Sequence, residues 1–341
     1  MRISPRRVGG DPAVDAATSS LRRRDRARTR WLGGLLLVAL LLAAPWAHGT
    51  CSVVAGINAL FGSVTSIAAR TTSQQTSTSQ AGLRCSGTLL SVLQPGDHFY
   101  ATIVSANAGL KGTSGDVLPY TLYGDSTTSY PIATGTAYDY ASTPLINLLG
   151  LLGGTPANLP LYFRTATGSN LAAGTYTDTL TINWSWNYCS GIGLAGICIG
   201  RDIGSGTSSF TATLSVTNDC TITAPAIAFG AAPIVSGFAP ISGALSMVCT
   251  KGMSYTVGLG PGLNAASNGR RQMASSGSWL QYDIFRSDGA VWNDSSARVA
   301  SSTVADGLTA QTYSFTARIY ADQTTPAAGS YTDSVVVDVH F

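Results

Sequence analysis

Six cysteines are the residues whose type and spacing are best suited to chemistry in this chain of 341 residues. They are Cys51, Cys85, Cys189, Cys198, Cys220 and Cys249. Cysteines can bind a metal ion or form disulfides, and common zinc sites combine close cysteine pairs with histidines. The chain has no CxxC pair, and beyond residue 49 its only histidines are His98 and His340. We therefore expect no metal site and no cofactor.

An even number of cysteines in an exported chain instead indicates disulfides, although six cysteines allow many pairings. The spacing favours three pairs, namely Cys51 with Cys85, Cys220 with Cys249, and Cys189 with Cys198. Closing each of the two longer loops is worth roughly 3 to 4 kcal/mol in the chain-entropy model.

Acid–base chemistry has one local candidate, the adjacent pair Asp97 and His98. A histidine base needs a carboxylate that orients it, but adjacent side chains rarely point together, and no serine in a nucleophile-elbow context accompanies the pair. His340 lies near the end of a predicted strand, where we expect it to face solvent or a bound partner. The chain contains no glutamate, phosphate loop or dinucleotide fingerprint. We therefore expect no enzyme, and a secreted hydrolase is the weakest alternative.

The first 49 residues predict export. An arginine-rich start is followed by the apolar run WLGGLLLVALLLAAPWA and by small residues at Ala47 and Gly49. This is the layout of a signal peptide cleaved near Gly49, because the apolar run is short for a membrane span. An uncleaved anchor is the alternative, and the long basic start leaves the true start codon open. We expect no transmembrane segment in the mature chain.

Removing residues 1–49 reverses the sign of the net charge. That segment holds nine arginines and three aspartates, so 11 basic and 14 acidic residues remain, a net charge of about −3. The basic character of the whole chain belongs to the export signal and is no argument for nucleic-acid binding.

Composition predicts an all-β fold that positions these residues. Without glutamate, and with lysine only at Lys111 and Lys251, the chain lacks the usual residues of exposed helix faces. Its many threonines, serines, glycines, valines and tyrosines suit strands and turns. The pair Asp288–Gly289 predicts a hairpin turn, and Asn268–Gly269 is a weaker signal of the same kind.

Two parts of the chain repeat one another. Each opens with a cysteine, an alternating apolar stretch and Phe-Gly, in CSVVAGINALFGS from Cys51 and CTITAPAIAFGAA from Cys220. Each contains a second cysteine and a strand-like segment, and each closes on a similar stretch, AAGTYTDTLTINW or AAGSYTDSVVVDV. Copies of about 120 to 140 residues with many short strands predict two tandem β-sandwiches of immunoglobulin-like size.

Alternation in the closing stretches predicts which side chains face each core. In the first copy these are Tyr176, Leu180, Ile182, Trp184 and Trp186. With Gly174 aligned on Gly329, the second copy has Tyr331, Val335, Val337, Val339 and Phe341 at corresponding positions.

The second copy resembles the spore coat protein U-like domain in three features. These are the cysteine with Phe-Gly of CTITAPAIAFG, the second cysteine, and the ending GSYTDSVVVDVHF. The match covers Cys220 to Phe341, and in the first copy it covers the ends but not the divergent middle. Members of this family are subunits of archaic chaperone–usher pili. The resemblance implies incomplete immunoglobulin-like sandwiches that lack one strand. A periplasmic chaperone fills the gap first, and an N-terminal strand of the next subunit fills it in the fibre, which is assembled at an outer-membrane usher.

The resemblance gives roles to two segments. The terminal strand with Val335, Val337, Val339 and Phe341 would be recognised by the chaperone. The stretch SSFTATLSVTNDC before Cys220 has the alternation of a donor strand, with Phe210, Ala212, Leu214 and Val216 on one side. In the family a donor strand precedes the first cysteine of its domain, but this one lies between the two domains.

This position predicts the organisation of the chain. We expect a signal peptide at 1–49, an adhesive domain at 50–199, a linker with the candidate donor strand at 200–219, and a pilin domain at 220–341. The donor-like segment would complete the first sandwich in cis; an ordinary linker, or a first strand of the second domain, is the alternative. Because the predicted cleavage site leaves no room for another donor strand before Cys51, the resemblance implies a tip subunit.

Adhesion needs a contact surface, and two apolar segments of the first domain are candidates. They contain Leu145, Ile146, Leu148, Leu149, Leu151 and Leu152, and, within the loop between Cys189 and Cys198, Ile192, Leu194 and Ile197. The alternative is that the leucine segment is buried beneath a loop.

The expected target of the adhesive domain is an abiotic or host surface, and its expected role is attachment and biofilm formation. The expected location of the protein is extracellular, after passage through the periplasm. A secreted envelope or coat protein that does not polymerise is the alternative function.

Overall fold

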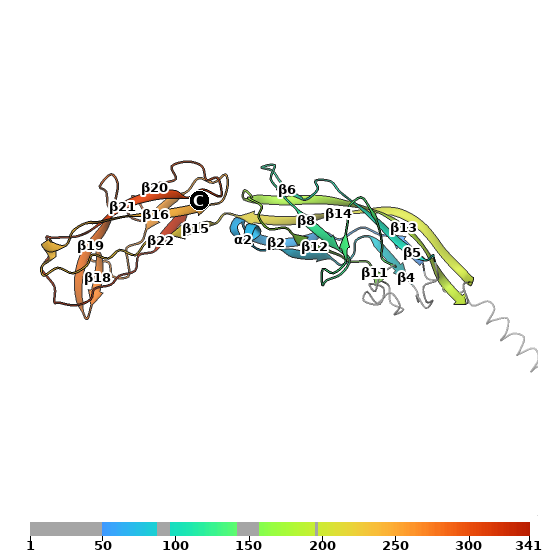
Figure 1. Cartoon of the computed structure of the whole chain (residues 1–341), viewed down its shortest axis with the longest axis horizontal. Coiled ribbons are helices and arrows are strands. Elements are labelled where there is room, and N and C mark those ends of the chain that lie inside the picture. Colours follow the sequence, from blue (N-terminus) through green and yellow to red (C-terminus); the bar gives the residue numbers. More distant parts are fainter. Residues whose placement is uncertain (1–49, 87–95, 142–156, 195–196) are drawn as a thin grey trace, which may run out of the picture. The chain divides into compact units, whose positions relative to one another are not determined.

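The computed structural model describes residues 50–86, 96–141, 157–194 and 197–341 (Figure 1). The predicted signal peptide at 1–49 and the leucine segment at 145–152 lie outside these residues. No helix within the described ranges is long and apolar enough to cross a membrane. The described chain is all-β, as predicted, and its apolar side chains form two separate cores.

In the described parts of residues 50–217, the first sandwich has three sheets and one short helix. Its strands are β1 (Thr50–Val53), β2 (Ala59–Thr65), β3 (Gln75–Thr78), β4 (Leu83–Ser86), β5 (His98–Ser105), β6 (Leu110–Gly112), β7 (Val117–Leu118), β8 (Tyr120–Tyr123), β9 (Pro131–Ile132), β10 (Ala137–Asp139), β11 (Ala157–Asn158), β12 (Leu161–Thr165), β13 (Gly174–Leu194) and β14 (Ile197–Thr217). The sheet orders are β1-β4-β11, β3-β12-β8-β9 and β10-β5-β13-β14-β2, with β6 also pairing with β13 and with β7. Helix α2 (Ser66–Thr71) begins after Thr65, whose hydroxyl accepts a hydrogen bond from the Ala68 amide.

The second sandwich has two sheets. Its strands are β15 (Cys220–Thr223), β16 (Ile241–Cys249), β17 (Thr256–Leu259), β18 (Arg271–Ser275), β19 (Ser278–Arg286), β20 (Val299–Ala300), β21 (Gln311–Ile319) and β22 (Val337–His340), and a single 3₁₀ turn covers Val235–Gly237. The sheet orders are β15-β16-β21-β19-β18 and β20-β17-β22. Buried polar contacts join the layers: the Trp292 indole N–H donates to the Val257 carbonyl (2.9 Å), and the Arg271 guanidinium, which pairs with Asp283 in its own sheet, donates to the Leu259 carbonyl of β17 (2.8 Å).

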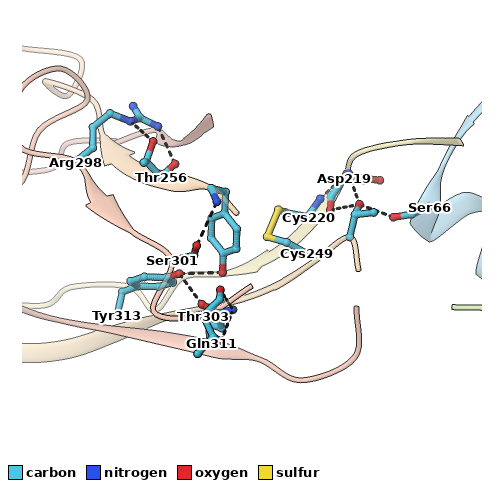
Figure 2. Close-up of a disulfide and its surroundings, with 12 residues drawn as sticks. Ser66, Asp219, Cys220, Cys249, Thr256, Arg298, Ser301, Thr303, Gln311 and Tyr313 are labelled. Atoms are coloured by element: carbon cyan, nitrogen blue, oxygen red, sulfur yellow. Dashed lines mark hydrogen bonds between the residues drawn. A yellow bond between two sulfur atoms is a disulfide. The ribbon is translucent and has the colours of Figure 1, made fainter. Parts of the chain in front are cut away.

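All six cysteines are paired, in the three combinations that the spacing favoured: Cys51–Cys85, Cys189–Cys198 and Cys220–Cys249. Two of the bridges join paired positions of neighbouring strands, β1 with β4 and β15 with β16. Figure 2 shows the bridge between β15 and β16 and, in the same sandwich, the Tyr313 hydroxyl that donates to the Tyr255 hydroxyl (2.9 Å).

The longest element is the hairpin of β13 and β14, which run side by side in Figure 1. They pair in one continuous register from Gly174 opposite Val216 to Cys189 opposite Arg201, and again up to Leu194 opposite Ile197. The linker expected at 200–219 is therefore almost entirely strand, because the backbone of β14 is held by β13 over this length. The first sandwich extends to Thr217 and does not end at residue 199.

Candidate functional site

The closing strand of the first sandwich, β13, has a neighbour on each edge. It pairs with β5 on one side, where Leu180 lies opposite Ser105, and with β14 on the other, where Leu180 lies opposite Phe210. Its inward side chains are buried as the alternation predicted, and these are Tyr176, Leu180, Ile182, Trp184 and Trp186. β13 thus has strand partners on both edges over most of Tyr176 to Asn187, and its inward apolar side chains there are buried.

Strand β14 covers the open edge of β13 as a donor strand would. Its inward side chains Phe210, Ala212, Leu214 and Val216 are each 4% exposed or less and belong to the first core. On its other edge β14 pairs in parallel with β2, so it lies between the opening and closing strands of the first copy. The segment before Cys220 therefore completes the core of the sandwich that precedes it in the chain.

The closing strand of the second sandwich, β22, has a neighbour on one edge only. It pairs with β17, where Val339 lies opposite Val257, and it is the last strand in its sheet order among the described residues. Val335, Val337 and Val339 pack against the second core but are only half-buried, and Phe341 is 63% exposed. The side chains predicted to face this core therefore lie at its open side.

A groove of about 880 Å³ lies in the second sandwich beside the start of its closing segment, where Tyr331 is one of the lining residues. One wall is formed by residues 227–238 and the other by residues 325–331, and neither wall forms a strand. Between the walls, the apolar side chains of Met273, Leu280 and Ile319 form the floor. Sequence analysis did not name these floor residues, because a single sequence gives no signal for which strands lie under a gap.

The wall at 227–238 corresponds to β2 in the first copy. Both contain Phe-Gly, and Gly62 and Gly230 share a positive φ, 84° and 77°. Residues with a side chain adopt this conformation less readily, so glycine is favoured at both positions. In the first sandwich this segment pairs with β14. In the second the same segment lies unpaired beside the groove, which is the place that a strand equivalent to β14 would occupy.

A tyrosine–aspartate hydrogen bond recurs near both closing strands. The Tyr120 hydroxyl donates to Asp178 in the first sandwich, and the Tyr282 hydroxyl donates to Asp333 (2.8 Å) in the second. Burial first, and then the bond to Asp333, raises the pKa of Tyr282. The Leu263 amide also donates to Asp333 (2.8 Å).

Gly262 makes room for this carboxylate, since a Cβ there would lie 2.2 Å from Asp333 Oδ2. The hydrogen bonds to Asp333 fix the start of the closing segment in the second sandwich, even though the groove beside it is open.

The pair Asp97 and His98 does not form a catalytic arrangement. Asp97 accepts from Arg201 Nη2 (2.9 Å) and from the Cys189 amide (3.3 Å). The His98 ring stacks on Tyr100, with 4.3 Å between ring centroids, and its Nδ1 lies 3.0 Å from the Gly96 carbonyl oxygen. His340 is exposed, with Nε2 3.0 Å from Asp338 Oδ2.

The candidate adhesive residues are only partly described. Ile192 and Leu194 lie in β13 and Ile197 begins β14, so all three are at the closed end of the long hairpin that the Cys189–Cys198 bridge crosses. The Ile197 side chain is 70% exposed. Ile203, further along β14, is 67% exposed and was not among the predicted residues. Gly200, Gly204 and Gly206 interrupt the alternation of apolar and polar side chains around Ile203, so the pattern did not predict an exposed strand residue there.

Comparisons with known proteins agree with this architecture. The solved chaperone–tip adhesion subunit pre-assembly complex from the archaic chaperone–usher Csu pili of Acinetobacter baumannii contains a chain 26% identical to this one. The similarity has a TM-score of 0.60 and covers 85% of this chain and 100% of that chain. A tip adhesin from Pseudomonas aeruginosa is 11% identical over 85% of this chain and 92% of its own, but its TM-score of 0.30 supports no argument. No curated protein matches the chain by sequence.

A family model for the Spore Coat Protein U domain matches residues 37–183 and 206–338. The two matches coincide with the two copies of the repeat, and together they cover most of the chain. The second match begins within β14, although the structure packs this strand in the first core. The chain therefore belongs to the Spore Coat Protein U domain family.

Proposed function

We propose that this chain is a tip subunit of an archaic chaperone–usher pilus. In this proposal the second sandwich accepts a strand from the next subunit, and the first sandwich attaches the fibre to a surface. The observation that carries the proposal is the contrast between the two closing strands: β13 has a strand on both edges, whereas β22 has a strand on one edge only, and the segment that leads into it, up to Tyr331, lines an open apolar groove. The 26% identity to a chain from a chaperone–tip subunit complex supports it.

Sheet chemistry explains why the open groove needs a partner. A missing strand leaves backbone N–H and C=O groups without partners and apolar side chains in contact with water. An extended strand added in trans supplies the hydrogen bonds and inserts alternate side chains into the groove. A periplasmic chaperone would do this before assembly, and a donor strand of the next subunit, delivered at the outer-membrane usher, would do it in the fibre.

The filled first groove supports the tip position. β14 is the segment with the alternation of a donor strand, but its inward side chains are already buried in the first core. Removing it to complete another subunit would expose that core. The chain thus offers one groove for a strand and keeps its own donor-like strand bound, which suits the last subunit of an extracellular fibre.

The closed end of the β13–β14 hairpin is the adhesive surface in this proposal. Ile197 is exposed there, and the Cys189–Cys198 bridge crosses the hairpin beside it. A rigid apolar surface loses little conformational freedom when it binds another apolar surface. Ile192 and Leu194 of the same hairpin, with the segment from Leu145 to Leu152, are proposed to contribute to attachment and biofilm formation.

Chaperone binding tests the open groove. With a chaperone of an archaic chaperone–usher system co-expressed in the periplasm, the chain should accumulate as a complex, and without it the chain should be degraded or aggregate. Val337→Asp places a charge on the half-buried face of β22 and should abolish the complex. Val336→Asp, on the exposed face, is the matched control and should retain it. A chain that is stable and monomeric without any chaperone would instead indicate an envelope protein that does not polymerise.

Attachment is tested separately on assembled fibres. Ile197→Ser should reduce binding to an apolar surface such as polystyrene while fibres still form. The control is Leu263→Ser, which removes an equally exposed apolar side chain from the second sandwich. Equal attachment by both variants and the unmodified chain would place the adhesive surface elsewhere.

A further inference from the structure

One arginine of the second sandwich, Arg298, bonds its closing strand to the rest of the sheet. It lies directly before β20, and its side chain is 11% exposed. A guanidinium group has five N–H donors, and here each of the five has an acceptor. Nε donates to Thr256 Oγ1 (2.9 Å), Nη1 to the Asp294 carbonyl (2.8 Å) and to Asp338 Oδ2 (2.5 Å), and Nη2 to the carbonyl oxygens of Thr256 (3.0 Å) and Asp338 (3.2 Å). Figure 2 shows the bonds from Arg298 to Thr256.

Arg298 reaches β22 from the far side of β17. β17 lies between β20 and β22, and Gly258 on β17 lies directly opposite Asp338 on β22. The pairing of Val257 with Val299 places Arg298 beside Gly258 on the other edge of β17. Neighbouring strands lie about 4.8 Å apart, so the arginine side chain extends over about 10 Å to the third strand.

Gly258 leaves the path of the arginine open. A Cβ at this position would lie 2.5 Å from Arg298 Nη1 and 3.1 Å from Arg298 Cζ, which is too close for either atom. Glycine is otherwise unfavourable within a strand, because it has no side chain to pack and loses the most conformational freedom on folding. The side chain that crosses β17 explains why glycine is present here.

The first sandwich has the same row of positions with different side chains. Its strands β10, β5 and β13 occupy the places of β20, β17 and β22. This row has Ala137 in place of Arg298, Thr102 in place of Gly258, and Asn183 in place of Asp338. An alanine is too short to cross the middle strand, and the middle strand carries a side chain at this position.

Asn183 is instead held from its other edge. Thr207 of β14 lies directly opposite Asn183, and its hydroxyl donates to Asn183 Oδ1 (3.0 Å). Among the described residues, β22 has no strand at the corresponding edge. Its Asp338 is bonded in the opposite direction, across β17 to Arg298. The two copies thus fix the same position of the closing strand from opposite edges.

We propose that Arg298 is a positioning residue that holds β22 in register on β17 while the other edge of β22 has no strand. β22 has only four residues, and Val337 and Val339 are half-buried, so apolar contact alone holds it weakly. Both Nη atoms of Arg298 act on Asp338, one on its carboxylate and one on its carbonyl, and hydrogen bonds to a charged donor are the stronger ones. A strand that is ordered in advance loses less conformational freedom when a partner binds its free edge.

Hydrogen exchange of the full chain tests this role without any partner. Arg298→Ala should accelerate exchange in residues 335–341 by about tenfold, because β22 then opens locally more often. Exchange in residues 311–319, which form β21, should stay unchanged. Asp338 Oδ2 also lies 3.0 Å from His340 Nε2, so all variants are compared at one pH. Unchanged exchange in residues 335–341 would overturn the proposal. Equal acceleration in both segments would also overturn it, because Arg298 would then stabilise the whole sandwich.

Arg318→Ala is the matched control for the loss of a guanidinium group. Arg318 is an exposed residue of β21 in the same sandwich, and its guanidinium lies 5.1 Å from the centroid of the Phe285 ring. In this variant, exchange in residues 335–341 should equal that of the unmodified chain. Acceleration as large as in Arg298→Ala would mean that the effect is not specific to Arg298, which contradicts the proposal.

Asp338→Asn tests whether Arg298 acts through Asp338. This variant keeps the size of the side chain and removes its charge. It should accelerate exchange in residues 335–341 less than Arg298→Ala does, because the backbone carbonyl of residue 338 still accepts from Nη2. The double variant should exchange no faster than Arg298→Ala alone, since both changes remove the same interaction. Fully additive acceleration would show that the two residues act independently and would overturn the proposal.

This role of Arg298 and the proposed function of the chain fail separately. The exchange measurement needs neither a chaperone nor another subunit, so it detects the ordering of β22 even if no chaperone binds. Loss of the chaperone complex in Val337→Asp with unchanged exchange in Arg298→Ala would leave the proposed function in place and overturn only the role of Arg298.

Discussion

The two closing strands begin alike and have unequal surroundings. GTYTD starts the one and GSYTD the other, and in both the aspartate accepts a hydrogen bond from a tyrosine of a neighbouring segment. β13 nevertheless extends to Leu194, paired with β14 along its length and with β5 up to Asn187, whereas β22 covers only Val337–His340 at the edge of its sheet. The difference shows that the closing sequence alone does not determine the length of its strand. A neighbouring strand does.

The exposure of corresponding side chains differs between the two closing strands in the same way. Trp184 and Val339 occupy corresponding positions, but Trp184 is buried in the first core, whereas Val339 is half-buried at the edge of the second core. The first sandwich thus has its full apolar contact within one chain, and under the proposed function the second reaches it with a strand of another molecule.

Leu214→Asp should break the first sandwich and has the largest expected effect. An unpaired carboxylate in the place of a completely buried leucine should lower the free energy of unfolding by more than about 4 kcal/mol. Urea unfolding followed by tryptophan fluorescence should lose the transition of the first sandwich and keep that of the second. Ser215→Asp, on the outward side of the same strand, should change stability by less than about 1 kcal/mol. Equal loss in both variants would mean that β14 is not part of the first core.

Truncation at corresponding positions of the two closing strands sharpens the comparison. Trp184→Ala should cost about 3 to 5 kcal/mol, because it leaves a cavity in a closed core. Val339→Ala should cost less than about 1 kcal/mol in the free chain, since the side chain is still half in contact with water. Once a donor peptide is bound, the cost of Val339→Ala measured by urea unfolding should rise. A large cost in the free chain would show that the second sandwich is already closed.

Removal of the Cys220–Cys249 bridge should destabilise the second sandwich by about 3 to 4 kcal/mol in the chain-entropy model. The double variant Cys220→Ser and Cys249→Ser should shift the second urea transition and leave the first unchanged. Removal of Cys51–Cys85 is the matched experiment for the first sandwich. A shift of both transitions by either pair would show that the two cores unfold as one unit.

The smallest expected effect concerns the tyrosine–aspartate bond and alkaline pH. Burial and the bond to Asp333 raise the pKa of Tyr282, so the folded chain keeps this proton where the unfolded chain loses it. The associated stability is fully present below about pH 10 and falls as the pH rises above it. Tyr282→Phe should remove this pH-dependent loss and should also remove one late-titrating phenol from the absorbance at about 295 nm. An unchanged titration would mean that Tyr282 does not titrate late.

Local patterns predicted much of the fold, and long-range pairing explains the rest. Alternation identified the inward face of β13, and Asp288–Gly289 forms a tight turn, with the Gly289 amide donating to the Arg286 carbonyl (3.0 Å). The hairpin between β18 and β19 was missed, although its turn residues Ser276 and Gly277, with positive φ of 43° and 82°, form a Ser-Gly pair of the kind that marks turns.

The candidate site was harder to predict than the fold. The alternation of β14 was visible in the sequence, but its partner was not, because both neighbouring cores offered an apolar face. The groove floor at Met273, Leu280 and Ile319 combines residues from three strands. Only the pairing of those strands brings the three side chains together.

The long ladder between β13 and β14 has a mechanical consequence. A pull between the closed end of the hairpin and Cys220 acts along β14, so the extended backbone of this single strand carries the load, and the hydrogen bonds to β13 and β2 hold the strand in place along its length. Two residues separate Thr217 from Cys220, where the Cys220–Cys249 bridge joins the backbone covalently to β16. Tension at the first sandwich would therefore be shared across a whole strand and then pass into a covalent cross-link, a construction that resists drag from flowing liquid.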